Sequence, residues 1–134
     1  MSASKHGTFS WCELLTTDVE GAKTFYGELL GWTTEAVTHE CDGSDETFEY
    51  NLVKADGTEV GGIMAVPAQA QGMPPCWGAY VTVDDVEAAA GKVRELGGDL
   101  IVPLQDIPGV GRFCVIRDPQ GATLTLITYL PGHE

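Results

Sequence analysis

The chain has 134 residues, of which 43% are hydrophobic and 20% are charged, and its formal net charge is −13. This length favours one compact domain, and we expect residues 1–134 to form it. The acidic balance repels nucleic-acid phosphates and anionic lipid, so neither nucleic acid nor a membrane is an expected partner. No run of about 18 apolar residues is present that would span a bilayer.

Two further features indicate the compartment. Residues 1–7 lack the apolar stretch of a secretory signal, and the four cysteines form no CxxC pair. We therefore expect a cytoplasmic protein with reduced cysteines that do not form a zinc site.

The first half of the chain predicts a strand, a helix and three more strands. The helix begins at the N-cap Asp18 and ends at Gly31, because apolar residues recur at helical spacing between a capping carboxylate and a glycine suited to a helix end. A strand is predicted before it at residues 8–16. Three strands follow at residues 32–39, 46–54 and 58–66, the last two joined by a turn at 55–57.

The second half repeats this pattern. Residues 85–98 align without gaps on residues 18–31, at an offset of 67 residues, with 7 identities in 14 positions. A strand is predicted before this second helix at residues 77–83. Strands at residues 99–107, 111–117 and 122–130 follow it. We therefore expect two β-α-β-β-β units, at about residues 8–66 and 76–130, joined by a linker at 67–75.

Two sets of motifs accompany the repeat. The first is DVEGAKTFYGELLGW at residues 18–32, and the second is VDDV at 83–86 with RDPQGA at 117–122. With the paired units, these motifs resemble the vicinal oxygen chelate superfamily of glyoxalase I, bleomycin-resistance proteins and extradiol dioxygenases. The resemblance covers about residues 8–130. It implies an α+β fold in which two tandem βαβββ units form a curved mixed sheet, and it implies a homodimer.

The resemblance also implies where a metal would bind. Glyoxalase-type members hold a divalent metal with four His or Glu ligands, and alignment on the motifs places these positions at Trp11, at Gly61 or Gly62, near Gly78 and at Thr125. Divalent metals in such proteins take imidazole or carboxylate ligands, and none of these residues supplies one. We therefore expect no metal and no other cofactor.

We expect the helix of each unit to cover one face of its sheet and to leave the other face open. This open face is the candidate site for a small organic ligand. Trp11 and Glu13 share one face of their strand. Glu13 is a candidate for binding a polar ligand group, for acting as a general base, or for a structural ion pair with Arg112. Tyr50, Trp77 and Tyr80 are candidates for stacking on a planar or cationic ligand, and each is also open to a packing role. Arg112 is a candidate anchor for a ligand carboxylate, and Thr125 is a further candidate for ligand binding.

The resemblance and these residues favour a metal-independent small-molecule-binding protein similar to the bleomycin-resistance branch. One alternative is a glyoxalase-like lyase or isomerase that uses Glu13 as a base or a divalent metal outside the aligned positions. Another is a regulatory or interaction subunit that binds no ligand. Metal content separates the enzyme from the binding protein, and a saturable thermal shift separates the binding protein from the interaction subunit.

Overall fold

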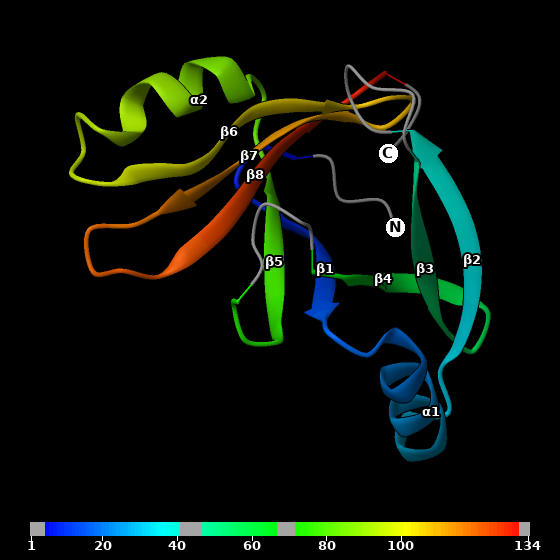
Figure 1. Cartoon of the computed structure of the whole chain (residues 1–134). Helices are drawn as coiled ribbons and strands as arrows, with labels where there is room; N and C mark the ends of the chain where they lie inside the picture. Colours follow the sequence, from blue (N-terminus) through cyan, green and yellow to red (C-terminus); the bar gives the residue numbers. More distant parts are fainter. Residues whose placement is uncertain (1–4, 41–46, 67–71, 132–134) are drawn as a thin grey trace. The chain divides into compact units, whose positions relative to one another are not determined.

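The computed structural model describes residues 5–40, 47–66 and 72–131 (Figure 1). The chain contains the element order β-α-β-β-β twice. The first set is β1 (Phe9–Thr16), α1 (Val19–Leu30), β2 (Thr33–Glu40), β3 (Thr47–Ala55) and β4 (Thr58–Ala65). The second set is β5 (Cys76–Thr82), α2 (Val86–Val93), β6 (Asp99–Ile107), β7 (Gly111–Arg117) and β8 (Thr123–Tyr129). The α+β class and the repeated β-α-β-β-β order are confirmed.

Residue contacts divide the chain into two compact units. The first comprises Trp11–His39 and Thr47–Gly78, and the second is formed mainly by Ala79–Glu134. Residues 67–71 of the expected linker lie outside the described residues, and residues 72–75 immediately precede β5. That the whole chain forms one domain remains a prediction.

Both helices begin at the aspartates that the sequence predicts. The carboxylate of Asp18 accepts the amide of Gly21 at 2.9 Å, and that of Asp85 accepts the first free amides of α2. Helix α1 ends at Gly31, which adopts the left-handed conformation with φ 76°. Helix α2 ends at Val93, earlier than expected, because the chain then tightens into a turn in which the amide of Gly98 bonds the carbonyl of Val93.

In the first unit, β1 pairs with β4 in parallel and β4 pairs with β3 in antiparallel register, in the strand order β2-β3-β4-β1. One face of this sheet carries the buried core residues Leu14, Val53 and Ile63. Residues of α1 and of the loop after it pack against this core, among them Tyr26 and Trp32. The helix therefore covers one face of the sheet and leaves the side chains of the other face uncovered by α1.

The second unit repeats this arrangement with the order β5-β8-β7-β6, and β5 and β8 are again parallel. Its core joins Val86 and Ala90 of α2 to Cys114 and Leu126 of the sheet. The hydroxyl of Thr128 donates to the carbonyl of Val83 at 2.8 Å and accepts the amide of Val86 at 2.9 Å. This hydroxyl fixes the start of α2 to β8.

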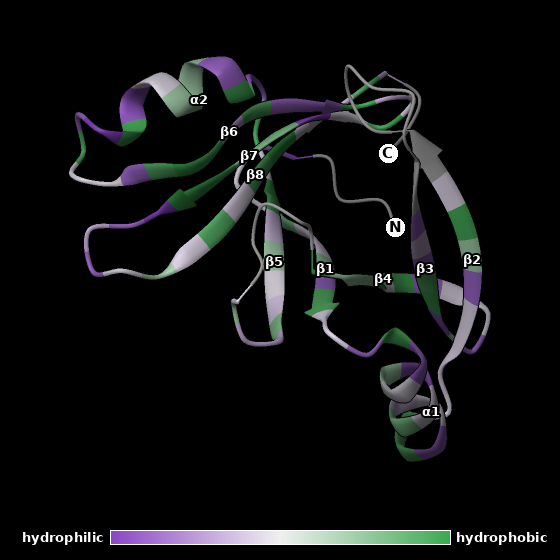
Figure 2. Cartoon of the chain, in the orientation of Figure 1, coloured by the Kyte–Doolittle hydropathy of each residue, from purple (hydrophilic) through white to green (hydrophobic). Residues whose placement is uncertain are grey.

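Hydrophobic and hydrophilic residues both occur along α1 and α2 (Figure 2). Only part of each helix surface therefore packs on its sheet. Within the described ranges, neither helix is long and apolar enough to cross a membrane.

Candidate functional site

The strand register of the first unit places two of the expected site residues on one face. Glu13 of β1 and Leu52 of β3 are both in register with Gly62 of β4, so these three residues point to the same side of the sheet. By alternation, Trp11 and Tyr50 point to that side as well. This is the face opposite the α1 core.

Trp11 and Tyr50 form a hydrogen-bonded aromatic pair on this face. The indole Nε1 of Trp11 donates to the Tyr50 hydroxyl at 2.7 Å, and Tyr50 is 9% exposed. The phenol lies over Gly62, where even a Cβ would overlap the hydroxyl and the ring. Gly61 is also constrained, because a Cβ there would meet the carbonyl oxygen of Cys12 at 2.6 Å. The absence of a side chain at Gly62 and Gly61 therefore allows the Tyr50 phenol and the Cys12 carbonyl to approach β4 closely.

Glu13 lies beside this pair. It is half-buried and in register with Gly62, so its carboxylate and the Tyr50 phenol belong to the same face. The structure thus brings together Trp11, Glu13 and Tyr50, three of the seven residues that the sequence nominates.

Trp77 belongs to a different cluster. Its indole Nε1 donates to the Tyr26 hydroxyl at 3.2 Å, and its ring makes edge contacts with Tyr26 and Trp32 at centroid distances of 5.5 and 5.9 Å. Tyr26 and Trp32 stack at 5.4 Å and pack against the α1 side of the sheet. The aromatic pattern of the sequence nominated Trp77 but missed Tyr26 and Trp32 as its partners, because the three residues lie on different elements.

Tyr80 and Thr125 are neighbours in the second unit. They are in register on the parallel strands β5 and β8, and both are half-buried. Their neighbours Val81 and Leu126 face the α2 core, so Tyr80 and Thr125 point to the opposite face of this sheet. That face of the second unit corresponds to the Trp11 face of the first.

Arg112 lies on the helix-covered face of the second unit. It is in register with Thr128, the residue that bonds the start of α2. Its guanidinium contacts the carboxylate of Asp106 at 2.7 Å and that of Glu87 in α2 at 3.1 Å. The hydrogen bond from Arg112 holds the pKa of Asp106 below its ordinary value. The Arg112 guanidinium is therefore ion-paired with two carboxylates of its own unit, one on β6 and one on α2.

The residues at the aligned metal positions do not fit a divalent metal. Trp11 presents an indole N–H, which is a donor, and Gly62 and Gly78 have no side chain. Thr125 offers one hydroxyl, and the Tyr50 phenol fills the space at Gly62. Within the parts of the chain that the structure describes, no three His, Cys, Asp or Glu residues gather closely enough to hold a metal ion.

The fold is built from paired βαβββ units, and Trp11 of the aromatic pair stands at one of the aligned metal positions while the Tyr50 phenol fills the space beside another, Gly62. The chain belongs to the Glyoxalase/Bleomycin resistance protein/Dioxygenase superfamily, whose family model matches residues 8–126. The family resemblance that the sequence motifs indicated is thereby confirmed.

Two curated relatives are similar over most of the chain. The Mycobacterium tuberculosis protein named "Putative glyoxylase CFP32" is 38% identical over 93% of this chain and 47% of its own length. The anthracycline biosynthesis protein DnrV of Streptomyces peucetius is 31% identical over 90% of this chain and 46% of its own. The chain therefore spans about half the length of these relatives.

Solved structures show the fold. The methylmalonyl-CoA epimerase of Mycobacterium tuberculosis matches 98% of this chain and 94% of its own, with a TM-score of 0.64 and 19% sequence identity. At this identity the likeness concerns the fold alone.

Proposed function

We propose that this chain binds a small organic ligand, without a metal ion, on the face of the first sheet that carries Trp11, Glu13 and Tyr50. The hydrogen bond between Trp11 and Tyr50 carries this proposal, because it fixes two aromatic rings before a ligand arrives. Rings that are already ordered lose little conformational entropy on binding. Glu13 on the same face supplies a carboxylate for an amine or hydroxyl of the ligand.

A second candidate surface lies within the second unit, considered by itself. Tyr80 and Thr125 offer a ring and a hydroxyl on the face opposite α2. Trp77 and Arg112 stay outside the proposed binding surface, because Trp77 packs with Tyr26 and Arg112 is bound by Asp106 and Glu87.

A planar polycyclic compound is the first ligand to test. Trp11 is half-buried, and offset stacking on its exposed ring surface favours flat rings. The relative named for anthracycline biosynthesis supports the same choice, since an anthracycline contains fused flat rings.

The test is a titration of the metal-free chain with an anthraquinone that carries an amine, followed by tryptophan fluorescence and calorimetry. Tyr50→Phe removes the acceptor of Trp11, and we expect it to weaken binding by about tenfold, or roughly 1.4 kcal/mol. Tyr26→Phe is the matched control, because it removes the other Trp–Tyr hydrogen bond of the first unit, on the α1 side. Equal affinity in wild type and Tyr50→Phe would contradict the proposal.

Metal content is measured in parallel. We expect the dialysed protein to contain no stoichiometric zinc, nickel, iron or manganese, and to bind the anthraquinone equally well with and without a chelator. Ligand binding that is lost in the chelator and restored by one of these metals would overturn the metal-independent proposal.

A glyoxalase-like lyase or isomerase is the second candidate, supported by the relative named as a glyoxylase and by the position of Glu13. A half-buried carboxylate on a ligand-binding face is placed to remove a proton from a carbon of the ligand. Such a base would exchange that proton for deuterium in D₂O, which NMR detects. Exchange catalysed by wild type and abolished in Glu13→Gln would favour the enzyme, and binding without exchange would favour the binding protein.

We also propose that two copies of the chain associate. The curated relatives contain about twice the length of this chain, so they have room for a second set of units. Light scattering of the purified chain tests this, with the mass of a dimer as the expected result.

A further inference from the structure

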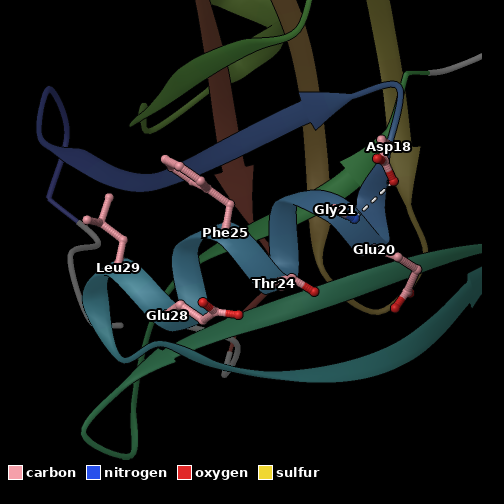
Figure 3. A pocket seen from close by; sticks show the side chains of 7 residues that line it. All are labelled: Asp18, Glu20, Gly21, Thr24, Phe25, Glu28 and Leu29. Carbon is pink, nitrogen blue, oxygen red and sulfur yellow. Dashed lines mark hydrogen bonds between the residues drawn. The ribbon is translucent and has the colours of Figure 1, made fainter.

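The outer surface of α1 carries a shallow, open apolar hollow with an acidic edge, which we call the groove. Phe25 and Leu29 are 59% and 62% exposed, and they follow Gly21 in one row at four-residue spacing. Glu20, Thr24 and Glu28 form the adjacent row. Together these rows line a surface pocket of about 860 Å³ (Figure 3). Figure 3 shows Phe25 and Leu29 leaving the helix on the same side.

Packing within the first unit explains only part of the apolar row. The Phe25 ring makes an edge contact with Tyr26 at a centroid distance of 5.0 Å, yet Phe25 stays 59% exposed. Tyr26 and Ala22 already supply the surface of α1 that packs against its sheet, and no residue of α1 is fully buried. In the repeat alignment, Phe25 corresponds to Lys92 of α2, a position that faces solvent. An exposed phenylalanine in α1, where α2 has a lysine, indicates that this part of the α1 surface binds another molecule.

The acidic row determines the charge of the groove. Glu28 lies in the last turn of α1, where the helix dipole is negative and where α1 carries no basic residue. Glu20 is paired with Lys23 at 3.1 Å, but no ion pair of Glu28 occurs among the described residues. The groove therefore combines an apolar row with a negative row whose charge is strongest at the C-terminal end of α1.

We propose that this groove docks a basic amphipathic segment of a partner protein. Apolar side chains of that segment would cover Phe25 and Leu29, while its lysines or arginines would lie along Glu20 and Glu28. A second copy of this chain is a poor occupant of this groove, because a two-fold contact here would set the two acidic rows against each other. This surface is separate from the Trp11 face, so the inference does not depend on the proposed ligand.

The probe is a fluorescein-labelled amphipathic helical peptide of leucine and lysine, titrated with the full chain and followed by fluorescence anisotropy. We expect Glu28→Lys and Leu29→Ser each to weaken binding by about tenfold or more. The repeat supplies matched controls, because Glu95 and Leu96 occupy the corresponding exposed positions beyond α2. Glu95→Lys and Leu96→Ser change charge and hydrophobicity by the same amounts and should alter affinity less than about threefold.

Three results would overturn the inference. One is an equal loss in the two glutamate variants, which would mean that the overall negative charge attracts the peptide. Another is no measurable binding by wild type. The third is a dimer in light scattering that dissociates on Leu29→Ser but not on Leu96→Ser, which would make a second copy the occupant. Far-UV circular dichroism confirms that each variant is folded.

Discussion

The guanidinium of Arg112 lies 2.7 Å from the carboxylate of Asp106 and 3.1 Å from that of Glu87. One cation thereby links two adjacent strands, β6 and β7, to the first turn of α2. Its side chain is 41% exposed, so solvent screens both ion pairs. Their contribution to stability is therefore small, but it depends on pH in a defined direction.

Acid should weaken the second unit through Asp106. The hydrogen bond from Arg112 lowers the pKa of this carboxyl from the ordinary value of 3.8, so the native state binds its proton less readily than the unfolded state. The resulting stabilisation is complete above pH 3.8 and is lost as the pH falls through the lower native pKa. Urea unfolding at pH 7 and at pH 2.5–4 should show this loss in wild type and less of it in Asp106→Asn. An identical acid dependence in both would contradict this assignment.

Alkaline pH should destabilise the second unit through ionisation of the Cys114 thiol. Burial raises the pKa of this thiol above 9.0 in the native state. The stabilisation is present below pH 9.0 and is lost as the pH rises through the native pKa, because the unfolded thiol ionises first. We expect the free energy of unfolding to fall more steeply above pH 9 in wild type than in Cys114→Val.

Thiol labelling gives an independent check on the same residue. Cys12 and Cys76 are exposed, whereas Cys114 is buried. Iodoacetamide at pH 8 should modify Cys12 and Cys76 within minutes and leave Cys114 unmodified until urea unfolds the chain. Peptide mass spectrometry measures each site, and rapid native labelling of Cys114 would mean that the core of the second unit opens readily.

Gly62→Ala should displace Tyr50. A Cβ at this position overlaps the phenol, so either the ring or strand β4 must move. We expect a loss of about 1–3 kcal/mol in urea unfolding, with a change in Trp11 fluorescence as its hydrogen bond breaks. Gly91→Ala is the control, because a Cβ there has no atom within 4 Å and an alanine suits a helix interior. Because the added Cβ overlaps the phenol, we expect the double variant Tyr50→Ala/Gly62→Ala to lose less free energy of unfolding than the sum of the two single variants.

Asp85→Ala should destabilise the start of α2. Its carboxylate accepts the amides of Glu87 and Ala88 at 3.0 and 3.2 Å, and replacing such a cap by alanine costs about 1 kcal/mol. Asp84→Ala removes a neighbouring exposed carboxylate that caps no helix and is the matched control. Equal losses of stability in the two variants would show that the negative charge matters more than the cap.

The sequence alone determined the repeated units and the ends of α1. These features are local, because a capping aspartate, a glycine at a helix end and periodic apolar residues lie within a few positions of one another. The exception is the end of α2, which falls at Val93 because the residues after it tighten into a turn. The family resemblance followed from the same local motifs.

Only the tertiary structure decided which nominated residues meet. Trp11 and Tyr50 lie 39 positions apart, and their hydrogen bond depends on the register of β1, β4 and β3 and on the absence of a side chain at Gly62. The register of β7 with β8 likewise turns Arg112 toward α2, and packing against α1 draws Trp77 to Tyr26. The physical reason is that a strand alternates its faces at every residue, so the partner strands decide what each side chain contacts.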